Sequence, residues 1–195
     1  MSKGTPFEKG RGVKMINKSF FKRDAQTVAK ALIGKTIEYN GKSAIITETE
    51  AYGSKDPFCY GVRYGKTANN KVSFMQGGHI FVYADMLMIT TGNEDEDSQN
   101  VLIRKADNPK CNGPCNLRKY FNITKELNGK YVGDESGIYI FDGNNAAVGS
   151  KKRGKFNTAK TIEDYKRRAE ISYEQSEKSV NKYYNIEWRF YIKKL

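Results

Sequence analysis

The chain has 195 residues, a length typical of one domain with a substantial buried core. Lysine and arginine outnumber aspartate and glutamate by 34 to 22, which gives a net charge of +12 and makes nucleic acid the first candidate partner. There is no apolar run long enough to span a membrane, no signal peptide, and no cysteine pattern typical of a disulfide framework, so we expect a protein that is not secreted, cytoplasmic (nucleoid-associated) or nuclear.

The N-terminal part is predicted to form an arm, a helix and a hairpin. Residues 1–18 are rich in glycine, lysine and serine without periodicity, and we expect a mobile basic arm there. After Asp24, a favourable N-cap, apolar residues recur at helical spacing through residues 25–33. Residues 36–39 are a predicted strand, and Asn40-Gly41 is the favoured two-residue turn into the next one.

This next strand, residues 44–53, carries two carboxylates near its end. Side chains alternate between the faces of a strand, so Glu48 and Glu50 are expected on one face and the intervening threonines on the other. A carboxylate on a buried strand beside an aromatic residue, here Tyr52, suits a general base next to a stacking platform. The alternative is a polar strand face in water.

A loop rich in aromatic and basic residues follows Gly53. This composition suits phosphates and stacked bases, although an ordinary surface loop with half-buried aromatics has the same composition. Within this loop we take Tyr60 as a candidate base-stacking residue and Arg63 and Lys71 as candidate nucleic-acid contacts.

The remainder is predicted as short strands and two helices. Strands are expected at 79–83, 86–91, 101–104, 137–142 and, at an edge of the sheet, 188–192, with a tight bend between the first two. Helices are expected at 117–121 and 162–168. The basic run 151–155 is expected to be a solvated loop or a phosphate contact. His79 is taken as structural, and no metal site is expected.

Several motifs occur in one characteristic order. The most specific is Thr47-Glu48-Thr49-Glu50-Ala51-Tyr52. The others are the helix from Arg23 to Lys35, Asp56-Pro57, Thr67 to Phe74, Gly78 to Tyr83, Val101 to Arg104, Asn112-Gly113-Pro114 and Trp188 to Ile192. In this order they resemble the alkyladenine (3-methyladenine) DNA glycosylase family over most of residues 19–193.

The resemblance implies a mixed α/β (α+β) fold. We expect a single compact domain, residues 19–195, around a curved antiparallel β-sheet with flanking helices and a protruding hairpin. No metal or organic cofactor is implied, and we expect a monomer whose partner is double-stranded DNA containing damaged purines.

The resemblance also implies a base-excision repair enzyme. It would flip an alkylated or deaminated purine out of the duplex and hydrolyse the N-glycosidic bond with an activated water, leaving an abasic site. By this resemblance Glu50 is the general base and Arg104 orients the catalytic site. Tyr52 and Tyr83 match the stacking tyrosines, and the main-chain carbonyl near Ala169 helps to hold the water.

Three departures from the family pattern affect the pocket. The family usually has a histidine in the loop where Tyr60 stands here. The segment after Tyr83 is shorter, so Met86 is either the wedge that fills the gap left by the flipped nucleotide or simply the next strand residue. Met88 occupies the place of an asparagine that helps to discriminate purines. Leu102 is a further candidate DNA contact.

Two other functions stay open on the sequence. The first is a non-catalytic nucleic-acid-binding protein on the same scaffold, with a hairpin too short to hold a flipped base. The second is a bifunctional glycosylase with a lysine Schiff base, although no lysine is expected in the core strands near Glu50.

Overall fold

The computed structural model describes residues 14–93, 97–143 and 145–193. The helices in this part of the chain are α2 (Ala25–Leu32), α3 (Tyr60–Tyr64), α4 (Pro114–Phe121), α5 (Thr158–Ala169) and α6 (Tyr173–Asn185), with short 3-10 helices η1 (Lys18–Phe20), η2 (Lys71–Phe74), η3 (Pro109–Cys111) and η4 (Lys125–Leu127). None of the described helices is long and apolar enough to cross a membrane.

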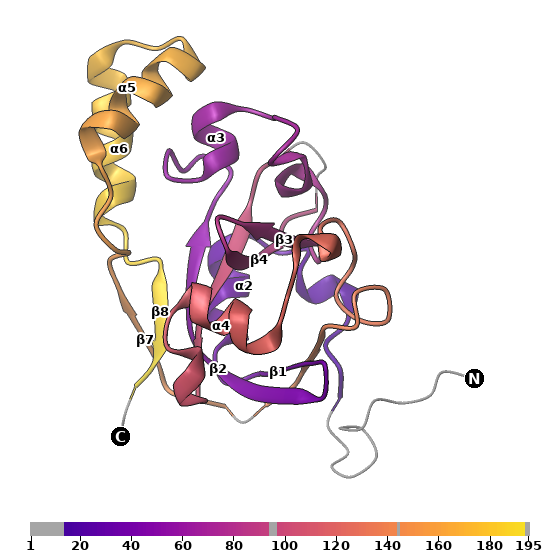
Figure 1. Cartoon of the computed structure of the whole chain (residues 1–195). Coiled ribbons are helices and arrows are strands. Elements are labelled where there is room, and N and C mark those ends of the chain that lie inside the picture. The colour runs from indigo at the N-terminus through magenta and orange to yellow at the C-terminus, as the bar shows by residue number, and fades with distance from the viewer. Residues whose placement is uncertain (1–13, 94–96, 144, 194–195) are drawn as a thin grey trace.

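The strands form one eight-stranded antiparallel sheet (Figure 1). They are β1 (Thr36–Tyr39), β2 (Lys42–Tyr52), β3 (Ile80–Tyr83), β4 (Met86–Thr90), β5 (Asn100–Ala106), β6 (Tyr139–Phe141), β7 (Val148–Lys151) and β8 (Arg189–Ile192). The order is β3-β4-β5-β2-β1-β6, with β8 also paired to β2 and β7 paired to β8. The expected mixed α/β fold around an antiparallel sheet is confirmed. The expectation that the last strand lies at an edge is wrong, because β8 has a partner on each side.

Strand β2 organises the sheet because it changes partners along its length. Its first half pairs with β1 through the predicted hairpin, in which Asn40 and Gly41 both have positive φ, 53° and 69°. Its second half lies between β5 and β8. The register with β5 shifts between Ile46 and Thr49, and such bulges bend a strand. The bulge lies where β2 exchanges its partner β1 for β5 and β8.

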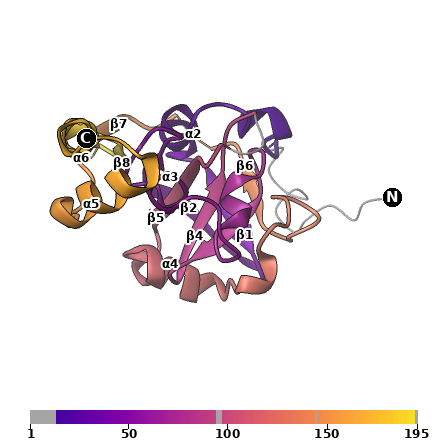
Figure 2. The same cartoon turned by 90° about the horizontal axis from the view of Figure 1, so that it is seen from above.

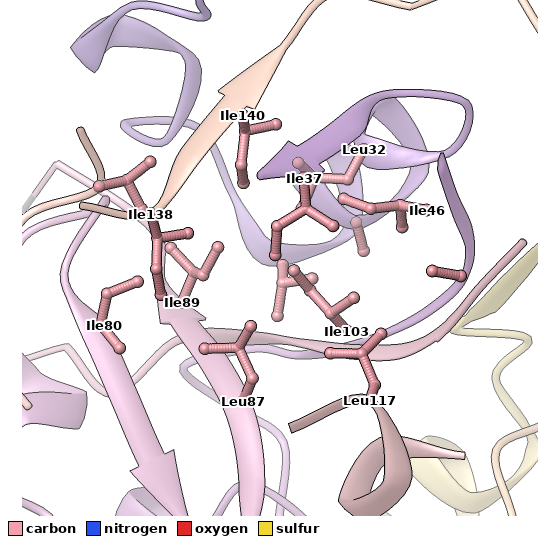
Figure 3. Close-up of a cluster of buried hydrophobic side chains, with 14 of the residues drawn as sticks. Leu32, Ile37, Ile46, Ile80, Leu87, Ile89, Ile103, Leu117, Ile138 and Ile140 are labelled. Carbon is pink, nitrogen blue, oxygen red and sulfur yellow. The ribbon is translucent and has the colours of Figure 1, made fainter. Parts of the chain in front are cut away.

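The core lies on the face of the sheet that α2 and α4 cover. Asp24 caps α2 by accepting a hydrogen bond from the Thr27 N–H at 2.9 Å, and one side of the helix is buried. The Thr49 hydroxyl donates to the Ala29 carbonyl at 2.8 Å, which joins β2 to α2 on this face. Figure 3 shows Leu32 of α2, Leu117 of α4 and isoleucines and leucines of the strands packed together.

The N-terminal boundary differs from the expected one. Residues 1–13 of the expected basic arm lie outside the described residues. Met15 forms a β-bridge with Phe141, and the Ile16 N–H donates to the Ile140 carbonyl at 3.0 Å. The Ile16 side chain is buried in the core. The described end of the arm is therefore part of the folded body.

Helices α5 and α6 form a layer of their own beside α3 and above β7 and β8 (Figures 1 and 2). The predicted helix 162–168 is confirmed as part of α5, whereas α6 was not predicted. Helix α6 starts with a capping box between Ser172 and Gln175. It has few apolar residues, and Val180 packs with Ile162 of α5 and Phe58 in a small separate cluster.

Candidate active site

The face of the sheet opposite the core carries a cavity of about 140 Å³. Its floor is built from alternate residues of neighbouring strands, as the period of two along a strand requires. The floor residues are Tyr52 of β2, Phe81 and Tyr83 of β3, Met86 and Met88 of β4, and Asn100 and Leu102 of β5; Phe58, Cys59, Tyr60, Ser73 and Phe156 complete the lining. Pockets for drug-sized ligands span roughly 300–1,000 Å³, so this cavity suits a single flat ring system.

Glu50 is not itself among the residues that line this cavity, but it is bonded to one of them, Tyr52. Glu50 is directly opposite Leu102 in the β2–β5 pair, and such residues project from the same face. The Glu50 carboxylate is buried, and its Oε2 accepts hydrogen bonds from the Tyr52 hydroxyl at 2.9 Å and from Arg104 Nη1 at 3.0 Å. Its Oε1 accepts no hydrogen bond from the described residues and lies 3.9 Å from Arg189 Nε, its ion-pair contact. One oxygen is therefore held by two hydrogen bonds, whereas the other is held by none.

Glu48 forms ion pairs with the cationic side chains around it. Its Oε1 accepts from Arg104 Nε at 3.1 Å and from Arg189 Nη2 at 2.6 Å, and its Oε2 lies 3.4 Å from Lys151 Nζ. Burial by itself would raise the pKa of Glu48, but the hydrogen bond and charge of Arg189, together with the nearby lysines, lower it below its ordinary value. Arg104 bridges the two carboxylates, which confirms that Glu48 and Glu50 share one face of β2.

The Tyr52 hydroxyl connects the cavity to the carboxylate. Burial, and then the negative charge of Glu50, raise the pKa of Tyr52 well above its ordinary value. The phenol therefore keeps its proton and donates it in the hydrogen bond to Glu50, while its ring forms part of the cavity wall.

Tyr60 and Tyr83 bring their rings together in the lining. Their ring centroids are 4.7 Å apart, and Tyr64 extends the group with its centroid 4.5 Å from that of Tyr60. Burial and a hydrogen bond with Tyr60 raise the pKa of Tyr83. The hairpin that presents Tyr83 closes with Ala84 and Asp85 at positive φ, 46° and 60°, which confirms the predicted tight bend.

Arg63, an expected DNA contact, is engaged inside the protein. Its Nε and Nη2 donate to Oδ2 of Asp164 at 3.0 and 2.6 Å, and the Tyr64 hydroxyl donates to the same oxygen at 2.8 Å. Only 16% of the Arg63 side chain is exposed. This cluster joins α3 to α5. A contact of Arg63 with DNA stays a prediction and would compete with Asp164.

The other expected binding residues lie in different surroundings. Lys71 is exposed at the start of η2, which contributes Ser73 to the lining of the cavity. Met86 and Leu102 line the cavity, and Leu102 is so buried that it can contact only a group inside it. Ala169 ends α5 and is not among the residues that line the cavity. The roles expected for these four residues stay predictions.

The sequence predicted no role for Arg189, and the surroundings that it predicted for Arg153 are wrong. Arg189 is directly opposite Glu50 in the β2–β8 pair, a register that nothing local in the sequence specifies. Arg153 lies in the basic run that was expected to be a solvated loop or a phosphate contact. Instead its guanidinium is buried against Asp56, with both terminal nitrogens donating to the carboxylate, and it also donates to the Ala51 carbonyl at 3.0 Å.

The part of the chain that carries these carboxylates is similar in sequence to known proteins. The model of the family described as methylpurine-DNA glycosylase matches residues 19–108, which include β1 to β5 and so the two carboxylates and Arg104. Three bacterial relatives are each named "Putative 3-methyladenine DNA glycosylase".

The extent of the similarity differs among these relatives. The relative from Rickettsia rickettsii is 38% identical over 118 residues, which are 55% of this chain and 64% of the relative. That from Rickettsia felis is 36% identical over 119 residues, 56% of this chain and 67% of the relative. The relative from Sodalis glossinidius is 34% identical over 139 residues, 66% of this chain and 81% of the relative. The match therefore spans a little less than two thirds of the R. rickettsii protein.

Proposed function

The chain belongs to the methylpurine-DNA glycosylase family, and from this premise we propose that it is a monofunctional base-excision repair glycosylase. Its partner is double-stranded DNA that contains an alkylated or deaminated purine. The enzyme flips the damaged nucleotide out of the duplex, hydrolyses its N-glycosidic bond with water and leaves an abasic site.

The observation that carries this proposal is the buried Glu50 carboxylate, bonded to the wall of an aromatic cavity, with one oxygen that accepts two hydrogen bonds and one that accepts none. A flipped base needs flat apolar walls, which Tyr52, Tyr60 and Tyr83 supply. The attacking water needs a base whose oxygen is not already hydrogen-bonded. Of the described Glu48 and Glu50 carboxylates, Glu50 Oε1 is the buried oxygen that accepts no hydrogen bond, and its ion-pair contact is Arg189 Nε at 3.9 Å. A non-catalytic binding protein requires no such carboxylate.

The same geometry supports a mechanism. As the purine leaves, positive charge develops on the sugar, and a buried carboxylate stabilises it. Glu50 then takes the proton of the attacking water through Oε1. Arg104 donates hydrogen bonds to Glu50 Oε2 and to Glu48 Oε1. These bonds hold the Glu50 carboxylate in one orientation. Tyr52 holds Oε2 from the other side.

An excision assay tests this function. Single-turnover reactions are run on duplexes that contain hypoxanthine, 1,N6-ethenoadenine or 3-methyladenine, with release of the free base and binding of the same duplexes as readouts. We expect release of at least one base and an abasic product. Tight binding of lesion duplexes without release of any base would overturn the enzymatic proposal in favour of the non-catalytic binding protein.

Because a lysine lies near the carboxylates, the assay includes a further measurement, borohydride trapping. Contrary to expectation, Lys151 of β7 reaches the site, 3.4 Å from Glu48. A lysine that formed a Schiff base with the sugar would be trapped on DNA by borohydride. We expect no trapped complex, because Lys151 is paired with a carboxylate and its side chain is 47% exposed, whereas a lysine that forms a Schiff base is activated by desolvation. A trapped adduct would replace hydrolysis with the bifunctional mechanism.

DNA binding is expected to weaken steeply with salt, because the +12 chain releases counterions from the phosphates it contacts. Lys71 is exposed on η2, whose Ser73 lines the cavity, so Lys71→Ala is expected to reduce the slope of log affinity against log salt by about 1. Lys30→Ala is the matched control, since α2 covers the opposite face of the sheet. Fluorescence anisotropy at several salt concentrations gives both slopes. Equal slopes for the two variants would remove Lys71 from the interface.

A further inference from the structure

One end of the otherwise apolar cavity is polar. Cys59, Ser73 and Asn100 line it, and Ser98 lies directly behind them; all four side chains are buried. Buried polar groups are expensive unless they are hydrogen-bonded, so each of these groups is expected to have a partner.

Hydrogen bonds join these four residues to one another. The Cys59 thiol donates to the Ser98 carbonyl at 3.3 Å, and the hydroxyls of Ser73 and Ser98 share a short hydrogen bond. The Asn100 amide nitrogen donates to Ser73 Oγ at 2.7 Å and contacts the Cys59 sulfur at 3.8 Å. The amide oxygen of Asn100 accepts no hydrogen bond from any described residue, although Asn100 is only 2% exposed. Asn100, one of the residues that line the cavity, therefore has an unused acceptor.

The position of this acceptor relative to Glu50 is set by the strands. Asn100 is directly opposite Tyr52 in the β2–β5 pair, and Leu102, two residues further along, is opposite Glu50. Alternate residues on a strand are roughly 7 Å apart. A purine whose sugar bond lies beside Glu50 and whose ring rests against Tyr52 would thus point its far edge, with positions 1 and 6, toward Asn100.

We propose that Asn100 determines specificity by accepting a hydrogen bond from an N–H on this far edge of the flipped purine. The proposal rests on the glycosylase function proposed above. It favours purines with a donor there, such as the N1–H of hypoxanthine or the 6-amino group of an alkylated adenine. It disfavours 1,N6-ethenoadenine, whose added ring leaves no N–H at this edge. A polar site left unpaired by a wrong substrate discriminates strongly against it.

The test compares hypoxanthine with 1,N6-ethenoadenine in identical duplexes. Asn100→Leu removes the acceptor at similar size and is expected to lower the ratio of hypoxanthine to ethenoadenine excision rates about tenfold. Ser73→Ala frees the amide to turn its nitrogen toward the base and is expected to lower the ratio less. Thr91→Val, a buried polar-to-apolar change away from the cavity lining, is expected to leave it unchanged.

Purely structural damage would lower both rates equally, so an unchanged ratio in Asn100→Leu and Ser73→Ala overturns the proposal. The affinities of the same two duplexes are also measured for the variant Glu50→Gln and for the double variant that combines Glu50→Gln with Asn100→Leu. If the wild type excises neither of these two bases, the affinity ratio reports on Asn100 instead, and the proposed function fails only if 3-methyladenine is not released either. An affinity ratio unaffected by Asn100→Leu would then overturn the role of Asn100 as well.

Discussion

Glu50→Gln is expected to lower the single-turnover excision rate by about 10²–10⁴-fold, the usual contribution of a positioned general base. Glutamine keeps the size of the side chain, and its amide oxygen can still accept from Tyr52 and Arg104 at the place of Oε2. The amide cannot take a proton from water, and it brings no negative charge to the developing cation. The loss is therefore expected in the chemical step, with binding of lesion duplexes retained.

The control for this experiment is Glu163→Gln, which makes the same change in net charge at an exposed position on α5. It separates the chemistry of Glu50 from a general gain in affinity for DNA. Rates are compared at enzyme concentrations that saturate the duplex. Excision by Glu50→Gln within about threefold of the control would show that another group activates the water.

The catalytic strand was predictable because its information is local. Alternation along β2 predicted that Glu48 and Glu50 share a face, and Arg104 contacts both of them. The same alternation placed Thr49 on the other face, where its hydroxyl bonds to α2. The turn at Asn40-Gly41 was also visible in the sequence, because positive φ at both residues favours this pair.

The rest of the site depends on contacts between distant segments. Arg189 reaches Glu48 across 141 positions of sequence, and Arg153 reaches Asp56 across 97. Arg189 lies between the apolar residues Trp188 and Phe190, and this pattern predicted a strand. The pattern did not indicate which other strand of the sheet it would pair with. In the run at 151–155, composition alone could not separate Arg153, which is buried, from its exposed neighbours.

The buried pair of Arg153 and Asp56 supports the cavity from behind. The guanidinium lies 4.8 Å from the centroid of the Tyr52 ring and 5.4 and 5.5 Å from those of Phe58 and Phe156, all of which line the cavity. Burial by itself would lower the pKa of Arg153, but the charge and hydrogen bonds of Asp56 outweigh it and raise the pKa. Burial raises the pKa of the Asp56 carboxyl, and the charge and hydrogen bonds of Arg153 oppose that rise, so each group depends on the other.

Arg153→Met is expected to lower the free energy of unfolding by about 3–5 kcal/mol, because it leaves the Asp56 carboxylate buried without its counter-ion. Methionine preserves much of the packing against the aromatic rings, so the loss reports mainly on the charge. Adding Asp56→Asn is expected to restore a large part of the stability, since the amide is neutral and can still accept from the Phe58 N–H. Denaturant titrations measure both variants against Lys155→Met, an exposed lysine of the same run. A loss as small as that of the control, or no recovery in the double variant, would mean that the ion pair does not hold this side of the cavity together.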